Sequence, residues 1–211
     1  MTLVGKQFPN IEIDAMDEMG DTFKLNIRKQ AIENKKKVLL FWYPKDFTFV
    51  CPTELHAFQD ALSKFEDRNT LVIGASCDTP EVHFAWLNTH KNEGGIEGVT
   101  YPILSDTNRN LSNRLGILDI VSEIYDEESD TMIYEGSNVT YRATYLIDEE
   151  GKVFHESVND MPLGRNVKEF LRLIDAYTHV QENGEVCPAN WEEGKEAMQA
   201  NRTGVAEYLS H

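Results

Sequence analysis

The sequence predicts an α/β fold in which helices flank a central mixed sheet. One supporting pattern is an apolar run at residues 38–43, followed by a helical pattern from residue 51 and a second apolar run at residues 70–76. This order of strand, helix and strand makes a βαβ unit with parallel strands and a right-handed crossover. The other pattern is at residues 141–158, which alternate in polarity and turn at DEEG, as is typical of a β-hairpin.

The first strand is the run VLLFWY at residues 38–43, which is apolar on both faces and therefore predicts a strand covered on both sides. Apolar residues then recur at helical spacing at Leu55, Phe58, Leu62 and Phe65. Pro52 suits the first helical position, because the N–H group that it lacks would have no partner there. Cys51 is therefore expected at the N-terminus of a helix and near the C-terminal end of a strand.

Three later segments complete the expected core. Residues 81–90 predict a helix, residues 99–106 a short strand, and residues 166–177 an amphipathic helix that closes the domain. We expect one domain over residues 1–180, followed by a polar arm, residues 181–211, that needs something to pack on.

Composition argues against several classes of function. The chain has 211 residues, of which 41% are hydrophobic, so it can bury a real core. Its 20 Lys and Arg residues against 36 Asp and Glu residues give a formal net charge of −16, which argues against binding nucleic acid or an anionic membrane surface. Some of this charge lies in the turn-rich segment 119–138, which is expected to be an exposed excursion or hairpin.

The N-terminus has neither the basic nor the apolar stretch of a signal peptide, and no run reaches the roughly 18 apolar residues that span a bilayer. A cytoplasmic location is therefore expected. Three cysteines, Cys51, Cys77 and Cys187, are too few and too far apart for a disulfide framework, and no Cys or His spacing gives a zinc site. We expect no metal and no bound cofactor, since a phosphate-binding Gly-rich loop is also missing.

Cys51 is the strongest candidate for chemistry. A helix N-terminus stabilises negative charge, and the thiolate is the reactive form of cysteine. The alternative is that Cys51 only fills space at the start of the helix, and position alone leaves both readings open. Pro44 lacks an N–H group and can shield one side of a small pocket, while the Thr48 hydroxyl can donate and accept beside the sulfur.

Other side chains have simpler interpretations. Cys77 ends a buried strand and is expected to pack in the core. The six histidines show no pairing that suggests a ligand set or a general base, so His56 is taken as an ordinary helical residue. Trp86 is expected in the core or at an interface.

Two cysteine motifs carry a family resemblance. The stretch YPKDFTFVCPTE resembles the active-site motif of peroxiredoxins, and GEVCPANW resembles the resolving-cysteine motif of the typical two-cysteine subgroup, which includes bacterial alkyl hydroperoxide reductase C. The segments VHFAWLNT, YRATYLID, VNDMPLGR and EYLSH also resemble family segments in family order, so the resemblance covers nearly the whole chain. It implies a thioredoxin-like fold and a thiol-dependent peroxidase.

The resemblance implies a role for individual residues. Cys51 would be the peroxidatic cysteine, which attacks hydrogen peroxide or an organic hydroperoxide and becomes a sulfenic acid. Thr48 would hydrogen-bond thiolate and substrate, Pro44 would exclude water, and Arg142 would stabilise the developing charge. A supporting ionic network would be formed by Glu54 and Arg165.

The resemblance also implies partners. Cys187, in the arm, would resolve the sulfenic acid across a subunit boundary of a homodimer, and such dimers would form a ring, a decamer. Electrons would come from a thioredoxin-like or flavoprotein disulfide reductase. In overoxidation-sensitive relatives a Gly-Gly-Leu-Gly loop and a C-terminal Tyr-Phe pack over the active-site helix, whereas this chain has GGIE, ending in Glu97, and Leu209 in place of Phe. Segment 119–138 is also longer here than in many relatives.

Of two other functions, the cysteine spacing argues against one and the other stays open. A thioredoxin-like disulfide oxidoreductase needs two thiols one helical turn apart, and Pro-Thr-Glu follows Cys51 without a second cysteine. A redox-regulated chaperone or peroxide-signalling protein remains the alternative, and it would protect clients even after loss of Cys51.

Overall fold

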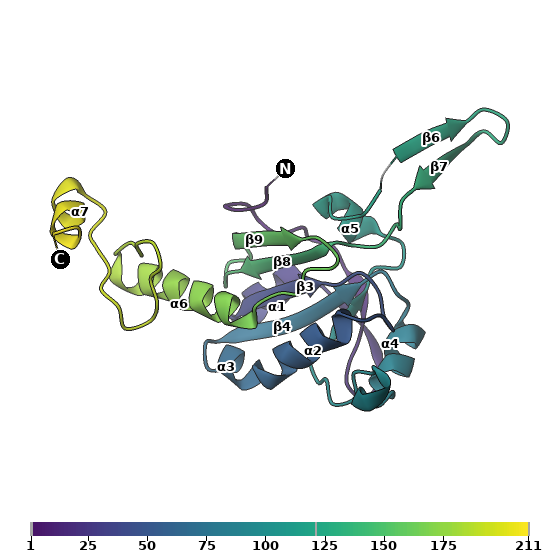
Figure 1. The fold of residues 1–211 in the computed structure, drawn as a ribbon, viewed down its shortest axis with the longest axis horizontal. Coiled ribbons are helices and arrows are strands. Elements are labelled where there is room, and N and C mark those ends of the chain that lie inside the picture. The colour runs from purple at the N-terminus through teal and green to yellow at the C-terminus, as the bar shows by residue number, and fades with distance from the viewer. Residues whose placement is uncertain (1, 121, 211) are drawn as a thin grey trace. The chain divides into compact units, whose positions relative to one another are not determined.

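The structure is a computed structural model that describes residues 2–120 and 122–210. Seven strands form one sheet in the order β2-β1-β5-β4-β3-β8-β9. The pairs β3–β4 and β4–β5 are parallel and the other four pairs are antiparallel, so the predicted mixed sheet is confirmed (Figure 1). The strands are β1 Ile13–Met16, β2 Thr22–Leu25, β3 Lys37–Trp42, β4 Thr70–Ser76, β5 Ile103–Ser105, β8 Arg142–Ile147 and β9 Val153–Asn159.

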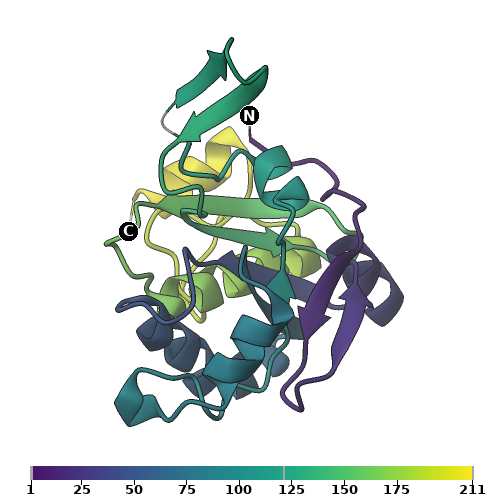
Figure 2. The ribbon, with the colours of Figure 1, turned by 90° about the vertical axis from the view of Figure 1, so that its right-hand side faces the viewer.

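Helices cover both faces of this sheet (Figures 1 and 2). On one face, Leu40 and Trp42 of β3 join a buried cluster with Ala31 of α1 (Ile27–Asn34). On the other face, the ring of Phe41 stacks on Phe58 of α2 (Cys51–Asp60), with ring centroids 4.1 Å apart. Every residue of β3 is buried, which confirms that this strand is covered on both sides.

The predicted βαβ unit is confirmed, with one difference. The helical pattern from residue 51 is divided into α2 and α3 (Leu62–Glu66), because Ala61 leaves the helical conformation at φ −102° and ψ 2°. No Pro or Gly marks this break in the sequence. The predicted helix at 81–90 is α4 (Pro80–Leu87), and the predicted strand at 99–106 is the shorter β5.

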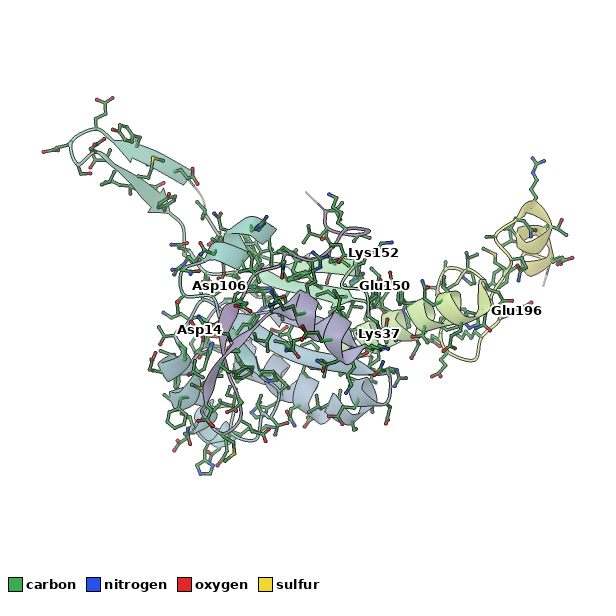
Figure 3. The ribbon with its side chains drawn as sticks, turned by 180° about the vertical axis from the view of Figure 1, so that it is seen from behind. Asp14, Lys37, Asp106, Glu150, Lys152 and Glu196 are labelled. Carbon is green, nitrogen blue, oxygen red and sulfur yellow. The ribbon has the colours of Figure 1, made fainter. Side chains whose placement is uncertain are left out.

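Several short elements were missing from the prediction. They are β1, β2, α1, the single 3-10 turn η1 (Lys91–Glu93), α5 (Asn110–Leu115) and α7 (Arg202–Tyr208). Polar side chains set the start of two of these helices: Asn26 accepts a hydrogen bond from the Lys29 N–H of α1. Asp106, labelled in Figure 3, accepts hydrogen bonds from the backbone N–H groups of Leu111 and Ser112 in α5. Such caps satisfy N–H groups that the helix itself leaves unpaired.

The segment 119–138 forms a hairpin, one of the two forms expected for it. Its strands, β6 (Ser122–Asp126) and β7 (Thr131–Glu135), pair antiparallel and make a separate two-stranded sheet (Figure 1).

The chain divides into two compact units between Arg165 and Asn166. In the second unit, the Asn166 side chain caps the start of α6 (Val167–Asn183), and Gly184, with φ 66°, caps its C-terminal end. The predicted helix at 166–177 is therefore confirmed but extends further, across residue 180, and the division of the chain at that residue stays a prediction. Among residues 2–120 and 122–210, no helix is both long enough and apolar enough to cross a membrane.

Candidate active site

Cys51 is the first residue of α2, as predicted, and its side chain is fully buried. The preceding strand β3 ends at Trp42, so a short loop carries the chain from the C-terminal end of β3 to the helix. Pro52 occupies the first turn, where its missing N–H costs no hydrogen bond. The helix N-terminus places partial positive charge beside the sulfur.

Arg142 supplies the second positive group. It begins β8, which pairs antiparallel with β3 so that Phe41 lies opposite Thr144. This register places Arg142 just beyond the C-terminal end of β3, the end of the strand that also leads to Cys51. Its Nη1 lies 3.4 Å from the Cys51 Sγ, and the residue is only 3% exposed.

Glu54, one helical turn after Cys51, joins Arg142 to Arg165. Its Oε2 accepts hydrogen bonds from Arg142 Nη1 at 2.6 Å and Arg165 Nη2 at 2.9 Å. Its Oε1 accepts from the Nε and the backbone N–H of Arg165, both at 2.8 Å. Burial by itself would raise the pKa of Glu54, but the hydrogen bonds and positive charges of Arg165 and Arg142 outweigh it and lower that pKa. The carboxylate is therefore ionised at neutral pH.

Further contacts fix both guanidinium groups. Arg142 Nε donates to the carbonyl oxygen of Met161 at 2.6 Å. Arg165 Nη1 donates to the carbonyl oxygen of Ala143 at 3.0 Å, and the Arg165 guanidinium lies 5.1 Å from the centre of the Phe41 ring, within cation–π range. Little reorientation is then needed when charge develops, which is what electrostatic catalysis requires.

Pro44 and Thr48 lie on the loop between β3 and α2. Pro44 is buried and Thr48 is half-buried. The Thr48 hydroxyl donates its proton to the carbonyl oxygen of Lys45 at 2.8 Å, so in this conformation it has acceptor lone pairs to offer. The structure thus brings Cys51, Glu54, Arg142 and Arg165 into direct contact, whereas the proton of Thr48 is directed to the loop backbone.

A buried polar cluster supports the same loop and was missed in the sequence. The sequence showed no histidine pairing that suggests a ligand set or a general base, but it did not reveal a buried pair at His83. The His83 Nδ1 lies 2.7 Å from Oδ2 of Asp46, and both side chains are fully buried. The Tyr43 hydroxyl donates to Asp46 Oδ1 at 2.8 Å, and His83 Nε2 donates to the Leu104 carbonyl oxygen at 3.2 Å. Burial raises the pKa of Asp46 despite these hydrogen bonds. His56 is also more than a helical residue, because its Nε2 donates to the carbonyl oxygen of Gly95 at 3.1 Å.

All three cysteines are free thiols. Cys77 lies 3.7 Å from the Ser112 hydroxyl, and burial raises the pKa of its thiol to about 11, so it is unreactive at neutral pH. Cys187 follows α6 and is half-buried, with its Sγ donating to the carbonyl oxygen of Ala176 at 3.6 Å. Burial also raises the pKa of Cys187, against the opposing effect of Arg172.

Two models of known protein families match the sequence of this chain. A sequence model of the AhpC/TSA family matches residues 4–156, and a model of the C-terminal domain of 1-Cys peroxiredoxin matches residues 176–211. The chain belongs to the peroxiredoxin family. It is therefore a thiol-dependent peroxidase, an oxidoreductase, as the two cysteine motifs predicted.

Relatives match over nearly their full length. Alkyl hydroperoxide reductase C of Helicobacter pylori is 40% identical over 98% of this chain and 96% of its own. Peroxiredoxin-2 of Bos taurus is 38% identical over 98% of this chain and 94% of its own. The crystal structure of a reduced 2-Cys peroxiredoxin from Plasmodium vivax covers 100% of both chains with a TM-score of 0.88 at 39% identity. These peroxiredoxin neighbours confirm the predicted thioredoxin-like fold.

Proposed function

We propose that Cys51 is the peroxidatic cysteine and that it reduces hydrogen peroxide and organic hydroperoxides. The observation that carries this proposal is the distance of 3.4 Å between the buried Cys51 Sγ and Arg142 Nη1 at the N-terminus of α2. The thiolate attacks the terminal oxygen of the peroxide, an S–O bond forms and the O–O bond breaks. The leaving oxygen takes up a proton and departs as water or an alcohol, and a sulfenic acid remains.

The residues around Cys51 would stabilise charge, position the substrate and exclude water. Arg142 stabilises the thiolate and the negative charge that moves onto the leaving oxygen, while Glu54 and Arg165 hold Arg142 in place. The Thr48 hydroxyl accepts a hydrogen bond from the hydroperoxide O–H group, and Pro44 excludes water from one side. None of these proposed roles needs a metal or an organic cofactor.

Cys187 would close the cycle. Its thiol attacks the Cys51 sulfenic acid of the partner subunit, a disulfide forms and water leaves. The raised pKa of Cys187 fits a thiol that is inert until it is presented to the sulfenic acid. The functional unit would be a homodimer within a ring of dimers in the cytoplasm, and a thioredoxin-like or flavoprotein disulfide reductase would return the electrons.

Cys187→Ser gives the direct test of resolution between subunits. After one equivalent of peroxide, the wild-type protein should run as a disulfide-linked dimer on a non-reducing gel, and the variant should not. Cys77→Ser is the matched control and should behave as wild type, because that thiol is held protonated by burial. A Cys51–Cys187 disulfide peptide found within monomeric bands would contradict the intersubunit step.

Overoxidation depends on how tightly α2 is covered, because the helix must unwind locally before its sulfur reaches Cys187. Here Glu97 pairs with His90 at 2.7 Å in an exposed position, and Leu209 is 76% exposed. The outer side of α2 borders an open pocket of about 460 Å³ whose lining includes Phe49 and His56. This helix is therefore expected to open readily and to resist overoxidation.

The double substitution Glu97→Gly with Leu209→Phe should raise the fraction of Cys51 recovered as sulfinic acid several-fold after turnover at rising peroxide. Some tens of Å² of added apolar cover, at about 25 cal/mol per Å², shift the opening equilibrium by about 1 kcal/mol. Mass spectrometry of the Cys51 peptide is the measurement, with Leu209→Ala as the control that adds no cover. A wild type that already inactivates at low peroxide, with no change in the double variant, would contradict this explanation.

A further inference from the structure

The acidic hairpin, residues 119–138, exposes apolar side chains on both of its faces. The exposed side chains are Ile124, Tyr125, Met132, Ile133 and Tyr134, each between 43% and 55% accessible. The strand register places Ile124 opposite Ile133 on one face and Tyr125 opposite Met132 on the other. A two-stranded hairpin is only marginally stable alone in water, and exposed apolar patches of this kind mark interaction sites.

Hydrogen bonds of Asp119 hold the two ends of the hairpin together at its root. Asp119 Oδ2 accepts hydrogen bonds from the hydroxyl and the backbone N–H of Ser137, at 2.7 and 3.2 Å. Its Oδ1 accepts from the Tyr141 hydroxyl at 2.9 Å, and its backbone N–H donates to the carbonyl oxygen of Val139. The hydrogen bonds from Ser137 and Tyr141 lower the pKa of Asp119, so its carboxylate stays ionised and keeps these hydrogen bonds at neutral pH. The two strands of the hairpin therefore start from fixed positions relative to each other.

Charge restricts what can cover this surface. Segment 119–138 contains seven Asp and Glu residues and no Lys or Arg, in a chain whose formal net charge is −16. A second copy would bring a like-charged hairpin against it, and charged side chains on an edge strand are a known barrier to such self-pairing. A cationic partner is attracted by the same charges.

The backbone of the hairpin offers the means of binding. In the described structure, β6 pairs only with β7, so each strand has one edge without a strand partner. An extended segment can add to such an edge through main-chain hydrogen bonds, and its alternate side chains then lie on the two faces. One face carries Tyr125, Met132 and Tyr134 together with Glu123, and the other carries Asp126 and Glu135 together with Ile124 and Ile133.

We propose that the acidic hairpin is a docking surface for a basic protein segment that binds in extended conformation as an added strand. Apolar side chains of the segment contact the face with the two tyrosines, and its lysines or arginines contact the carboxylates of the opposite face. This surface is separate from the peroxidase chemistry, because none of the residues assigned to the active site belongs to the hairpin.

A labelled peptide of alternating Lys and Val, titrated with the full-length protein and followed by fluorescence anisotropy, tests the proposal. Binding should be saturable, should weaken as salt rises, and should be at least about tenfold tighter than binding of a peptide of alternating Glu and Val. Tyr125→Ser with Tyr134→Ser and, separately, Asp126→Asn with Glu135→Gln should each weaken binding about tenfold. The matched control, Glu33→Gln with Glu66→Gln, removes two exposed charges elsewhere and should bind as wild type.

Peroxide consumption by each variant reports that the fold is intact, since the substituted residues lie outside the active site. Equal affinity of the wild type and both hairpin variants for the Lys-Val peptide would overturn the proposal. It would also be overturned if the hairpin variants changed the sedimentation coefficient of the protein without changing peptide affinity, because the occupant would then be a second copy.

Discussion

Cys51→Ser should reduce the rate of peroxide consumption by more than about 10⁴-fold while leaving the fold unchanged, because a serine hydroxyl stays protonated at neutral pH and cannot form the sulfenic acid. The replaced sulfur is fully buried, and serine is close to it in size, so packing around α2 is preserved. Stopped-flow measurement of peroxide loss with a chemical reductant gives the rate, and circular dichroism with thermal unfolding checks the fold.

Cys77→Ser is the matched control for this result. Cys51 is buried and Cys77 is half-buried, and of the two only Cys51 has an arginine nitrogen within hydrogen-bonding distance of its sulfur. We expect the Cys77 variant to retain wild-type peroxide kinetics. A folded Cys51→Ser protein with near wild-type turnover would show that the nucleophile lies elsewhere.

Glu54→Gln should have the second largest effect, on stability and activity together. The change removes the one carboxylate that two buried guanidinium groups share, so Arg142 and Arg165 are left with uncompensated charge. Breaking a buried ionic network in this way costs about 3–5 kcal/mol, and displacement of Arg142 should lower kcat/KM about 100-fold. Chemical denaturation gives the stability, and peroxide kinetics under conditions where the variant is folded give kcat/KM.

The pH dependence of stability supplies an independent readout. The pKa of Glu54 is lower in the folded protein than its ordinary value of 4.5, so its contribution is complete above that value and is lost as pH falls through the folded-state pKa. Wild-type stability should therefore drop below about pH 4.5 more steeply than that of Glu54→Gln. The control Glu66→Gln changes an exposed carboxylate and should retain the wild-type profile. Identical acid profiles for wild type and Glu54→Gln would contradict the assignment.

The sequence was informative where local pattern decides structure. The apolar run of β3 and the helical spacing after Cys51 predicted the strand and the helix that place the sulfur, because burial on both faces and a helical period are visible in consecutive residues. The break at Ala61 could not be predicted, since alanine is the best helix former and neither Pro nor Gly stands beside it. Helix α6 likewise extends beyond its apolar pattern until Gly184 ends it.

The site was predicted in part by resemblance and in part not at all. Arg142 and Arg165 are ordinary arginines in the sequence, 88 and 111 residues from Glu54, and only the family motifs pointed to them. The pairing of His83 with Asp46 spans 37 residues and depends on how α4 packs, so no spacing rule reveals it. The Met161 carbonyl that orients Arg142 is a backbone atom and has no sequence signal.

Counted as charges, the buried cluster holds two arginines and one carboxylate, a surplus of one positive charge in a region closed to water. A thiolate at Cys51 brings the sum to zero, whereas a sulfenic acid, being neutral, leaves it at one. An unpaired charge away from solvent raises the free energy of the folded state, so the electrostatic free energy of this site differs between the thiolate and sulfenic acid forms. With Cys51 as the proposed nucleophile, each turnover would convert a charge-balanced site into one with a buried surplus of positive charge. Entry of water would then stabilise that charge, so we expect α2 to open more readily in the sulfenic acid form than in the thiolate form.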